Sequence, residues 1–270
     1  MAERFDVSRT GTSLAGERWP GHGSTVLLLH EGVSDRRGWA AVAGLLAPEL
    51  TVVTYDRRGF GQTPVSTEPF SHLDDLLAVI DQAGAAQVWL VGASAGGGLA
   101  LDAALEAPQR VAGLVLMGTA VSGEPEPELD ADTKRLEPLL EKAYATRDAD
   151  EINRLETWLW LDGPSQPEGR VGGAARKLAL AMNAVIVANN VPESEGAAGV
   201  DAWHRLAEVT VPVTVACGDL DVPFLVDRCR LLADRLPAAR HHVLAGMAHQ
   251  PYLESATAVA ELIRSAVAGT

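Results

Sequence analysis

The feature that most constrains the fold is a series of short apolar runs that do not alternate with polar residues. Strands covered on one face alternate between apolar and polar residues, whereas strands covered on both faces of a parallel sheet are apolar throughout. The chain therefore predicts a mostly parallel sheet buried between two layers of helices. The six runs are Ser24–His30, Thr51–Tyr55, Gln87–Val91, Val111–Met117, Val211–Cys217 and His242–Leu244.

Helical patterns separate these runs. Because strand and helix alternate along the chain, we expect a doubly wound α/β sheet with right-handed crossovers. The segments Phe5–Arg9 and Ser13–Arg18 predict an antiparallel hairpin at one edge, which brings the sheet to eight strands. The predicted helices cover Trp39–Leu46, Ser71–Gln82, Gly96–Glu106, Pro223–Leu236 and Ser255–Val267.

The alternation is interrupted between Val121 and Val200. This segment opens with the Pro- and acid-rich stretch SGEPEPELDAD and has no run typical of a strand. Helix-like stretches lie at Leu136–Tyr144, Glu151–Leu161 and Gly173–Val187. We interpret residues 122–200 as a helical lid inserted between two strands of a core that comprises residues 1–121 and 201–270.

Composition excludes several classes of function. The formal net charge of −14 disfavours binding to nucleic acid or to an anionic membrane surface, since both need clustered Lys and Arg. The amino-terminal segment lacks the apolar core of a secretory signal, and Leu178–Val191 is too short and too rich in Asn to span a bilayer. Cys217 and Cys229 form neither a disulfide framework nor a metal-ligand pattern. We expect a cytoplasmic protein that acts on a small molecule.

One short motif indicates nucleophilic chemistry. The stretch LVGASAGGG places Ser94 in a Gly-x-Ser-x-Gly pattern between a predicted strand and a predicted helix. This is the arrangement of a nucleophile elbow, in which the serine lies on a tight, strained turn. Gly92 and Gly96 fit that turn because larger side chains would collide with the sheet or with the following helix. Ser94 is therefore the candidate nucleophile.

A nucleophilic serine needs a base, and the base needs a carboxylate that orients it. The stretch GDLDVP follows a predicted strand, and Asp221 lies further into its loop than Asp219, so we favour Asp221 as the acid. The stretch GMAHQ places His249 in the loop before the final helix. The other histidines are less suited; His22, His72 and His204 are expected at the surface.

The developing oxyanion also needs hydrogen-bond donors. The N–H of Ala95, directly after the nucleophile and at the start of a helix, is one candidate. The loop LLLHEGVSDRRGW follows an earlier strand, and there the N–H of Gly32 is placed to be the other.

Five stretches together resemble the α/β-hydrolase fold superfamily: LLLHEGVSDRRGW, YDRRGFGQT, LVGASAGGGLAL, GDLDVP and GMAHQPYLE. They occur in the order typical of that family and extend from Leu27 to Glu254. The Tyr55–Gly61 block resembles a structural turn of the family and receives no catalytic role. The resemblance implies Ser94 as nucleophile, Asp221 as acid, His249 as base, and the N–H groups of Gly32 and Ala95 as the oxyanion hole.

One position departs from the family pattern. The family usually has glycine after the histidine at the end of this strand, whereas here Glu31 follows His30. A buried and unpaired carboxylate beside a developing oxyanion would be costly. We therefore expect the Glu31 side chain to point to solvent.

Within the superfamily, the chain resembles small esterases and lactonases of the 3-oxoadipate enol-lactonase type, and its YDRRGFGQ block is similar to cofactor-free haloperoxidases (perhydrolases). The resemblance implies a serine hydrolase that cleaves a carboxylic ester or lactone through an acyl-enzyme, with no metal or organic cofactor. A serine at position 94 argues against haloalkane dehalogenase or epoxide hydrolase chemistry. The alternatives are hydrolysis of a C–C bond in a diketone or dienol-acid, perhydrolysis, and a non-catalytic binding member of the fold.

The segment 122–200 contains apolar side chains that could line a pocket for a largely apolar substrate or simply pack against the core. Side chains at the ends of the core strands would complete such a pocket. The candidate pocket residues are His30, Trp158, Trp160, Met182, Ile186 and Val222.

Overall fold

The computed structural model describes residues 2–66, 68–189 and 200–269. Its centre is an eight-stranded sheet with the order β1-β2-β4-β3-β5-β6-β7-β8. Strand β2 runs antiparallel to both of its neighbours, and all the other pairs are parallel. The predicted sheet and its edge hairpin are confirmed. The strands are β1 (Glu3–Arg9), β2 (Thr12–Trp19), β3 (Thr25–Leu29), β4 (Thr51–Tyr55), β5 (Val88–Ala93), β6 (Val111–Met117), β7 (Val213–Gly218) and β8 (Ala239–Leu244).

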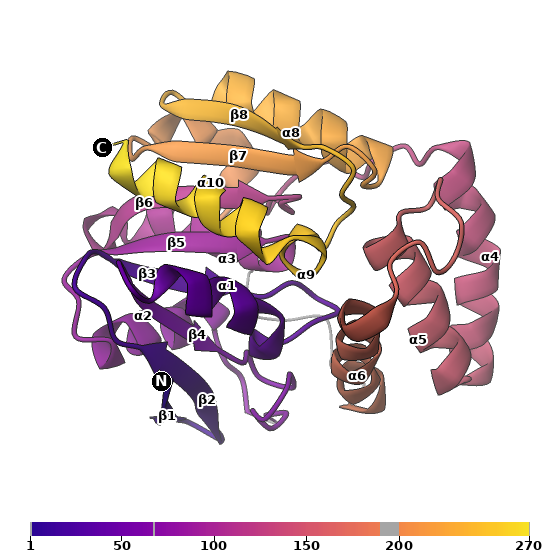
Figure 1. Cartoon of the computed structure of the whole chain (residues 1–270), viewed down its shortest axis with the longest axis horizontal. Coiled ribbons are helices and arrows are strands. Elements are labelled where there is room, and N and C mark those ends of the chain that lie inside the picture. The colour runs from indigo at the N-terminus through magenta and orange to yellow at the C-terminus, as the bar shows by residue number, and fades with distance from the viewer. Residues whose placement is uncertain (1, 67, 190–199, 270) are drawn as a thin grey trace.

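Helices cover both faces of this sheet (Figure 1). The central strands are buried throughout, so each face contributes to a separate apolar core. Helices α2, α3 and α8 pack on one core, whereas α1, α9 and α10 pack on the other. Their bounds are η1 (Arg36–Trp39), α1 (Ala40–Leu46), α2 (His72–Gln82), α3 (Ala95–Glu106), η2 (Pro108–Arg110), α7 (Ala202–Arg205), η5 (Leu206–Glu208), α8 (Pro223–Arg235), α9 (Pro251–Glu254) and α10 (Ala256–Ala268).

The helical elements that lie between β6 and residue 190 are referred to here as the inserted helices. They are α4 (Ala131–Thr146), α5 (Ala149–Thr157), the π-helical η3 (Trp158–Asp162) and α6 (Gly173–Asn189). Figure 1 shows them gathered beside the sheet rather than on either of its faces. Residues 190–199 of the predicted insertion, and with them the end of Leu178–Val191, lie outside the described residues.

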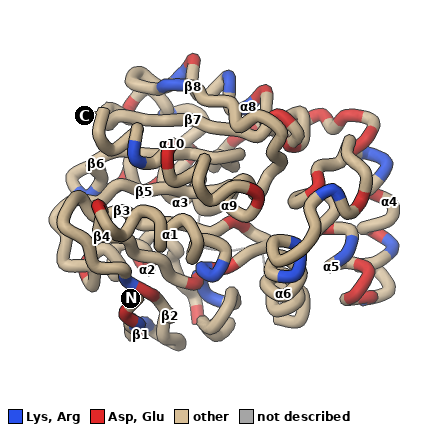
Figure 2. The backbone as a smooth tube through the Cα atoms, viewed as in Figure 1, with Lys and Arg blue, Asp and Glu red and all other residues tan. Residues whose placement is uncertain are grey.

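Basic residues are spread along the described part of the chain. Figure 2 shows Lys and Arg scattered over many elements, with Asp and Glu interspersed among them on the inserted helices. This distribution agrees with the net charge of −14. Within the part of the chain that the structure describes, no helix has the length and apolar character needed to cross a membrane.

Candidate active site

The turn between β5 and α3 holds Ser94 in a strained backbone conformation. Its φ of 47° and ψ of −118° lie in a region that residues with a side chain rarely adopt. Two glycines make the turn fit. A Cβ on Gly92 would lie 2.3 Å from the carbonyl oxygen of Gly96, and one on Gly96 would lie 2.4 Å from that of Leu29. The half-buried Ser94 is thus held at the carboxyl edge of the sheet by backbone geometry.

Asp221 and His249 meet next to this turn. Asp221 follows β7, His249 precedes α9, and Asp221 Oδ2 lies 2.9 Å from His249 Nδ1. The other carboxylate oxygen accepts a hydrogen bond of 2.7 Å from the N–H of Val222, which fixes its orientation. Both side chains pack against Gly118, where a Cβ would lie 2.9 Å from His249 Nδ1. The carbonyl oxygen just before Gly118 accepts a hydrogen bond of 2.8 Å from the N–H of Ser94.

Glu31 is buried, so the expectation that it points to solvent is wrong. Its Oε1 accepts hydrogen bonds from Gln250 Nε2 and, at 2.9 Å, from the Tyr252 hydroxyl. A buried carboxylate without hydrogen-bond donors would be costly, and these two side chains are its donors. Both lie on the segment that directly follows His249. Glu31 Oε2 lies 3.5 Å from His249 Nε2. A carboxylate therefore faces each ring nitrogen of His249.

This setting changes the protonation of both groups. Burial alone would lower the pKa of His249, but the carboxylates of Asp221 and Glu31 outweigh burial and raise the pKa to about 9. Burial raises the pKa of Glu31 above its usual value, and the facing His249 partly offsets that rise. The two facing carboxylates therefore favour the protonated form of the His249 ring. Among the described residues, Ser94 Oγ has no hydrogen-bond partner.

Arg57 fixes the loop that carries Glu31. Its guanidinium donates hydrogen bonds of 3.2 Å and 2.7 Å to the carbonyl oxygens of His30 and Glu31. Its backbone N–H donates to His30 Nε2 at 3.0 Å. Burial lowers the pKa of Arg57 to about 10, and no carboxylate in the described residues lies within ion-pair distance. The Tyr55–Gly61 block, for which no catalytic role was expected, therefore supports the candidate oxyanion loop.

The two candidate oxyanion donors line different cavities. The N–H of Gly32 donates to no group in the described part of the chain, and Ala95, as the first residue of α3, has no intrahelical acceptor for its N–H. Gly32 lines a cavity of about 590 Å³ under the inserted helices. Ala95 lines one of about 230 Å³, together with Arg57 and Asp102.

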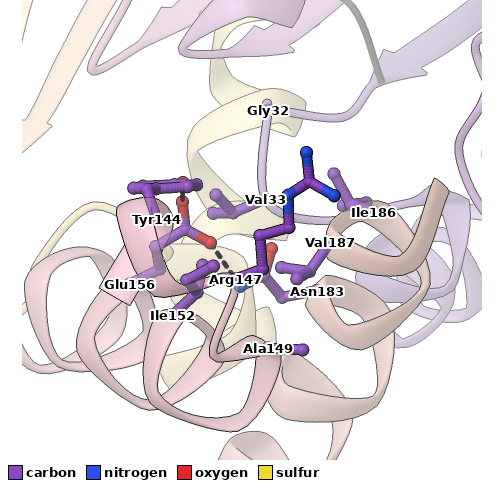
Figure 3. Close-up of a pocket in the computed structure, with 10 residues that line it drawn as sticks. All are labelled: Gly32, Val33, Tyr144, Arg147, Ala149, Ile152, Glu156, Asn183, Ile186 and Val187. Carbon is purple, nitrogen blue, oxygen red and sulfur yellow. Dashed lines mark hydrogen bonds between the residues drawn. The ribbon is translucent and has the colours of Figure 1, made fainter. Parts of the chain in front are cut away.

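The larger cavity combines apolar and polar side chains (Figure 3). Glu156 accepts hydrogen bonds from the Tyr144 hydroxyl and, at 2.7 Å, from Asn183 Nδ2, so its carboxylate is engaged. Arg147 ends α4 with a φ of 54° and makes no ion pair with any residue that the structure describes. Figure 3 shows its side chain extending toward Ile186 and the loop of Gly32. The cavity therefore offers one uncommitted positive charge.

The candidate pocket residues have different environments. Ile186 lines the larger cavity. The Trp160 ring lies 4.7 Å from the His249 ring, centroid to centroid, and so covers one face of it. The remaining four lie elsewhere. His30 contacts Arg57, and Met182 is fully buried. Trp158 and Val222 belong to an apolar cluster between the inserted helices and the start of α8.

His72 is buried beside Arg57 at the smaller cavity, so its expected surface position is wrong; the Phe70 ring and the start of α2 enclose it.

Across the residues that the structure describes, no cluster of three or more His, Cys, Asp or Glu side chains has the arrangement needed to hold a metal ion.

A family model for the alpha/beta hydrolase fold matches residues 24–256, and the chain belongs to this family. A putative 2-succinyl-6-hydroxy-2,4-cyclohexadiene-1-carboxylate synthase of Bacillus subtilis is 24% identical over 87% of each chain. The esterase RhEst1 from a Rhodococcus species has a TM-score of 0.77 at 23% identity, covering 99% of this chain and 98% of that one. An enol-lactonase from Burkholderia xenovorans has a TM-score of 0.70 at 19% identity, covering 97% and 99%.

Proposed function

We propose that the protein is a serine hydrolase that cleaves a carboxylic ester or lactone through an acyl-enzyme on Ser94. The observation that carries this proposal is the strained Ser94 elbow, next to a buried Asp221–His249 pair at the same edge of the sheet. Strain of this kind persists where the surroundings enforce it, and it exposes the hydroxyl to a substrate. The esterase and enol-lactonase among the structural neighbours support the same class of reaction.

In the proposed reaction, His249 Nε2 accepts the Ser94 proton while Oγ forms a bond to the carbonyl carbon. The N–H groups of Gly32 and Ala95 stabilise the oxyanion of the tetrahedral intermediate. The intermediate expels the alcohol, which takes the proton from His249 and leaves the acyl group on Ser94. Water then repeats the sequence with His249 as the base and releases the acid. Asp221 holds the imidazole in one tautomer and stabilises its charge.

The inserted helices are proposed to act as a lid that determines the substrate. The larger cavity is lined by the apolar Val33, Ile152 and Ile186, which suit an apolar body, and by Arg147, which suits an anionic group. We therefore expect an ester or lactone that carries a carboxylate remote from the scissile bond. A cytoplasmic location is part of the proposal, and the free, buried thiols of both cysteines are consistent with it.

The alternative that uses the same residues is hydrolysis of a C–C bond in a diketone or dienol-acid. One relative is named as a putative cyclohexadiene-carboxylate synthase rather than as an esterase, which is the reason to test this alternative. A panel of matched esters, lactones and vinylogous diketones, each with and without a remote carboxylate, separates the two reactions. Perhydrolysis is measured on the same panel after addition of peroxide and acetate.

Labelling tests the nucleophile directly. Folded protein treated with a fluorophosphonate should carry the label on Ser94 in peptide mass spectrometry, whereas denatured protein should not. Ser94→Ala should fold normally by circular dichroism and lose at least about 10³-fold in ester turnover. An unlabelled Ser94 in folded protein, or a Ser94→Ala variant with full turnover, would refute the proposal.

A further inference from the structure

The departure from the family pattern at position 31 has a specific counterpart in the structure. Glu31 Oε1 is held by Gln250 and Tyr252, while Oε2 has no hydrogen-bond partner among the described residues and faces a ring nitrogen at 3.5 Å. That nitrogen, His249 Nε2, is the atom that the proposed reaction requires to be free. The Tyr252 hydroxyl also lies 3.0 Å from Ser34 Oγ, so the donor is itself fixed. Glu31 is therefore aimed at the base by the surrounding structure.

We propose that Glu31 is a positioning residue that holds a proton on His249 Nε2 in the free enzyme, and so sets the pH range in which His249 can act as a base. This inference rests on the proposed function. With both nitrogens protonated, His249 cannot accept the Ser94 proton. The Nε2 proton must first leave to solvent, and its departure frees the lone pair for Ser94 while Glu31 stays a carboxylate. The same carboxylate then stabilises the imidazolium that forms when Ser94 attacks.

The other groups around His249 do not replace Glu31. Asp221 faces Nδ1, on the far side of the ring from Nε2. Cys217 and Cys229 lie behind Asp221 on β7 and α8, and the Cys217 thiol donates to Asp221 at 3.5 Å. The Trp160 ring covers one face.

Among the described residues, three side chains surround the Glu31 carboxylate. They are His249, Gln250 and Tyr252, with Arg57 bound to its carbonyl oxygen rather than to its carboxylate. Glu31 is therefore the one carboxylate among the described residues that faces Nε2.

The sign of the pH dependence follows from this geometry. The pKa of His249, raised to about 9, places the rise of kcat/KM in the alkaline range, because activity appears only as the ring loses its proton. Glu31→Gln removes a charge that faces the ring and should lower the pKa of His249 by about 1 to 2 units. The variant should consequently be more active than the wild type at pH 7. At high pH it should be less active, since a weaker base stabilises the attack less.

The test combines an activity profile with a titration that needs no turnover. NMR of 13C-labelled histidine, with His249→Ala for assignment, gives the pKa of His249 in the wild type and in Glu31→Gln. Glu31→Gly, which restores the residue usual in the family, is the second variant in case the amide disturbs the fold. Glu254→Gln is the matched control, because Glu254 bonds the N–H of Ala248 and Arg170 rather than the ring.

We expect the pKa of His249 to fall in both Glu31 variants and to stay unchanged in Glu254→Gln. The pH profiles of kcat/KM for the wild type and for Glu31→Gln should cross. A wild-type His249 that is neutral at pH 7.5, or one whose pKa is unchanged in a folded Glu31 variant, overturns the inference. These outcomes are distinct from failure of the proposed function. If Ser94→Ala remained active, the nucleophile would be wrong while the titration of His249 would still report on Glu31.

Discussion

The carboxyl edge of the sheet and the inserted helices differ in how they use charged side chains. At the sheet edge, charges point inward and hold loops. The Arg58–Asp75 pair, for example, is 2.6 Å long, with 3% and 2% of the two side chains exposed. On the inserted helices the Arg154–Glu151 pair is 2.7 Å long, but its side chains are 40% and 39% exposed. Removing one partner costs about 3–5 kcal/mol for a buried pair and about 0–1 kcal/mol for an exposed one.

This difference separates the region proposed to carry out the reaction from the region proposed to select the substrate. At the sheet edge, glycine turns, strand ends and buried pairs leave little freedom, so the backbone fixes the positions of the groups proposed to react. On the inserted helices most charges are at the surface, and the polar side chains that line the larger cavity are Tyr144, Arg147, Glu156 and Asn183. We therefore expect substitutions at the sheet edge to change kcat by orders of magnitude, and substitutions on the inserted helices to change KM for some substrates only.

The largest effect in this comparison is expected for Asp221→Asn. An amide cannot stabilise the imidazolium and favours the wrong tautomer of His249, so kcat should fall by about 10³- to 10⁴-fold with little change in KM. Steady-state kinetics on a nitrophenyl ester measure this fall. The matched control is Asp219→Asn, because the exposed Asp219 accepts a hydrogen bond of 2.6 Å from the N–H of Gly246 and none from His249. A similar loss in both variants would mean that Asp221 is not the orienting acid.

A smaller loss is expected for Gly96→Ala, which tests whether the backbone fixes the elbow. The new methyl group would lie 2.4 Å and 2.6 Å from the carbonyl oxygens of Leu29 and His30. The turn must shift, so kcat/KM should fall by about 100-fold, and the free energy of unfolding should fall by about 1–3 kcal/mol. Gly44→Ala is the control, since Gly44 lies in α1 and, apart from its chain neighbours and the helix's own backbone, no atom of the described residues lies within 4 Å of the added carbon. It should stabilise the protein by roughly 0.5–1 kcal/mol without changing turnover.

The same comparison explains what could be predicted from the sequence. The sheet, its edge hairpin and its helices follow from periodicity, because apolar runs and helical spacing reflect burial directly. The positions of Ser94, Asp221 and His249 at strand ends follow from local motifs and chain order. The structure places Asp221 and His249 in contact, at the edge where the motifs predicted them.

The environment of Glu31 could not be predicted in this way. Its two donors lie more than two hundred residues further along the chain, and nothing local to Glu31 indicates them. The sequence argument assumed an unpaired charge, and tertiary packing supplied the partners. The Pro251–Glu254 helix, two residues after His249, was the available signal, since its residues had to pack near that histidine. Arg147 was missed for a similar reason, because its exposure to the cavity depends on how α4, α5 and α6 pack together.

The smallest effect is expected for Arg147→Ala, which tests whether the inserted helices act on the substrate alone. An exposed ion pair contributes up to about 1 kcal/mol, so KM should rise about fivefold for an ester with a remote carboxylate. KM for the matched neutral ester, and kcat for both, should stay within about twofold if the arginine binds a distant group only. Arg154→Ala is the control, because that arginine is already paired with Glu151 and Glu168. An equal rise of KM for the neutral ester would mean that Arg147 shapes the cavity rather than binding an anion. A fall in kcat would mean that the inserted helices act on the reaction as well as on substrate binding, which contradicts the contrast with the sheet edge.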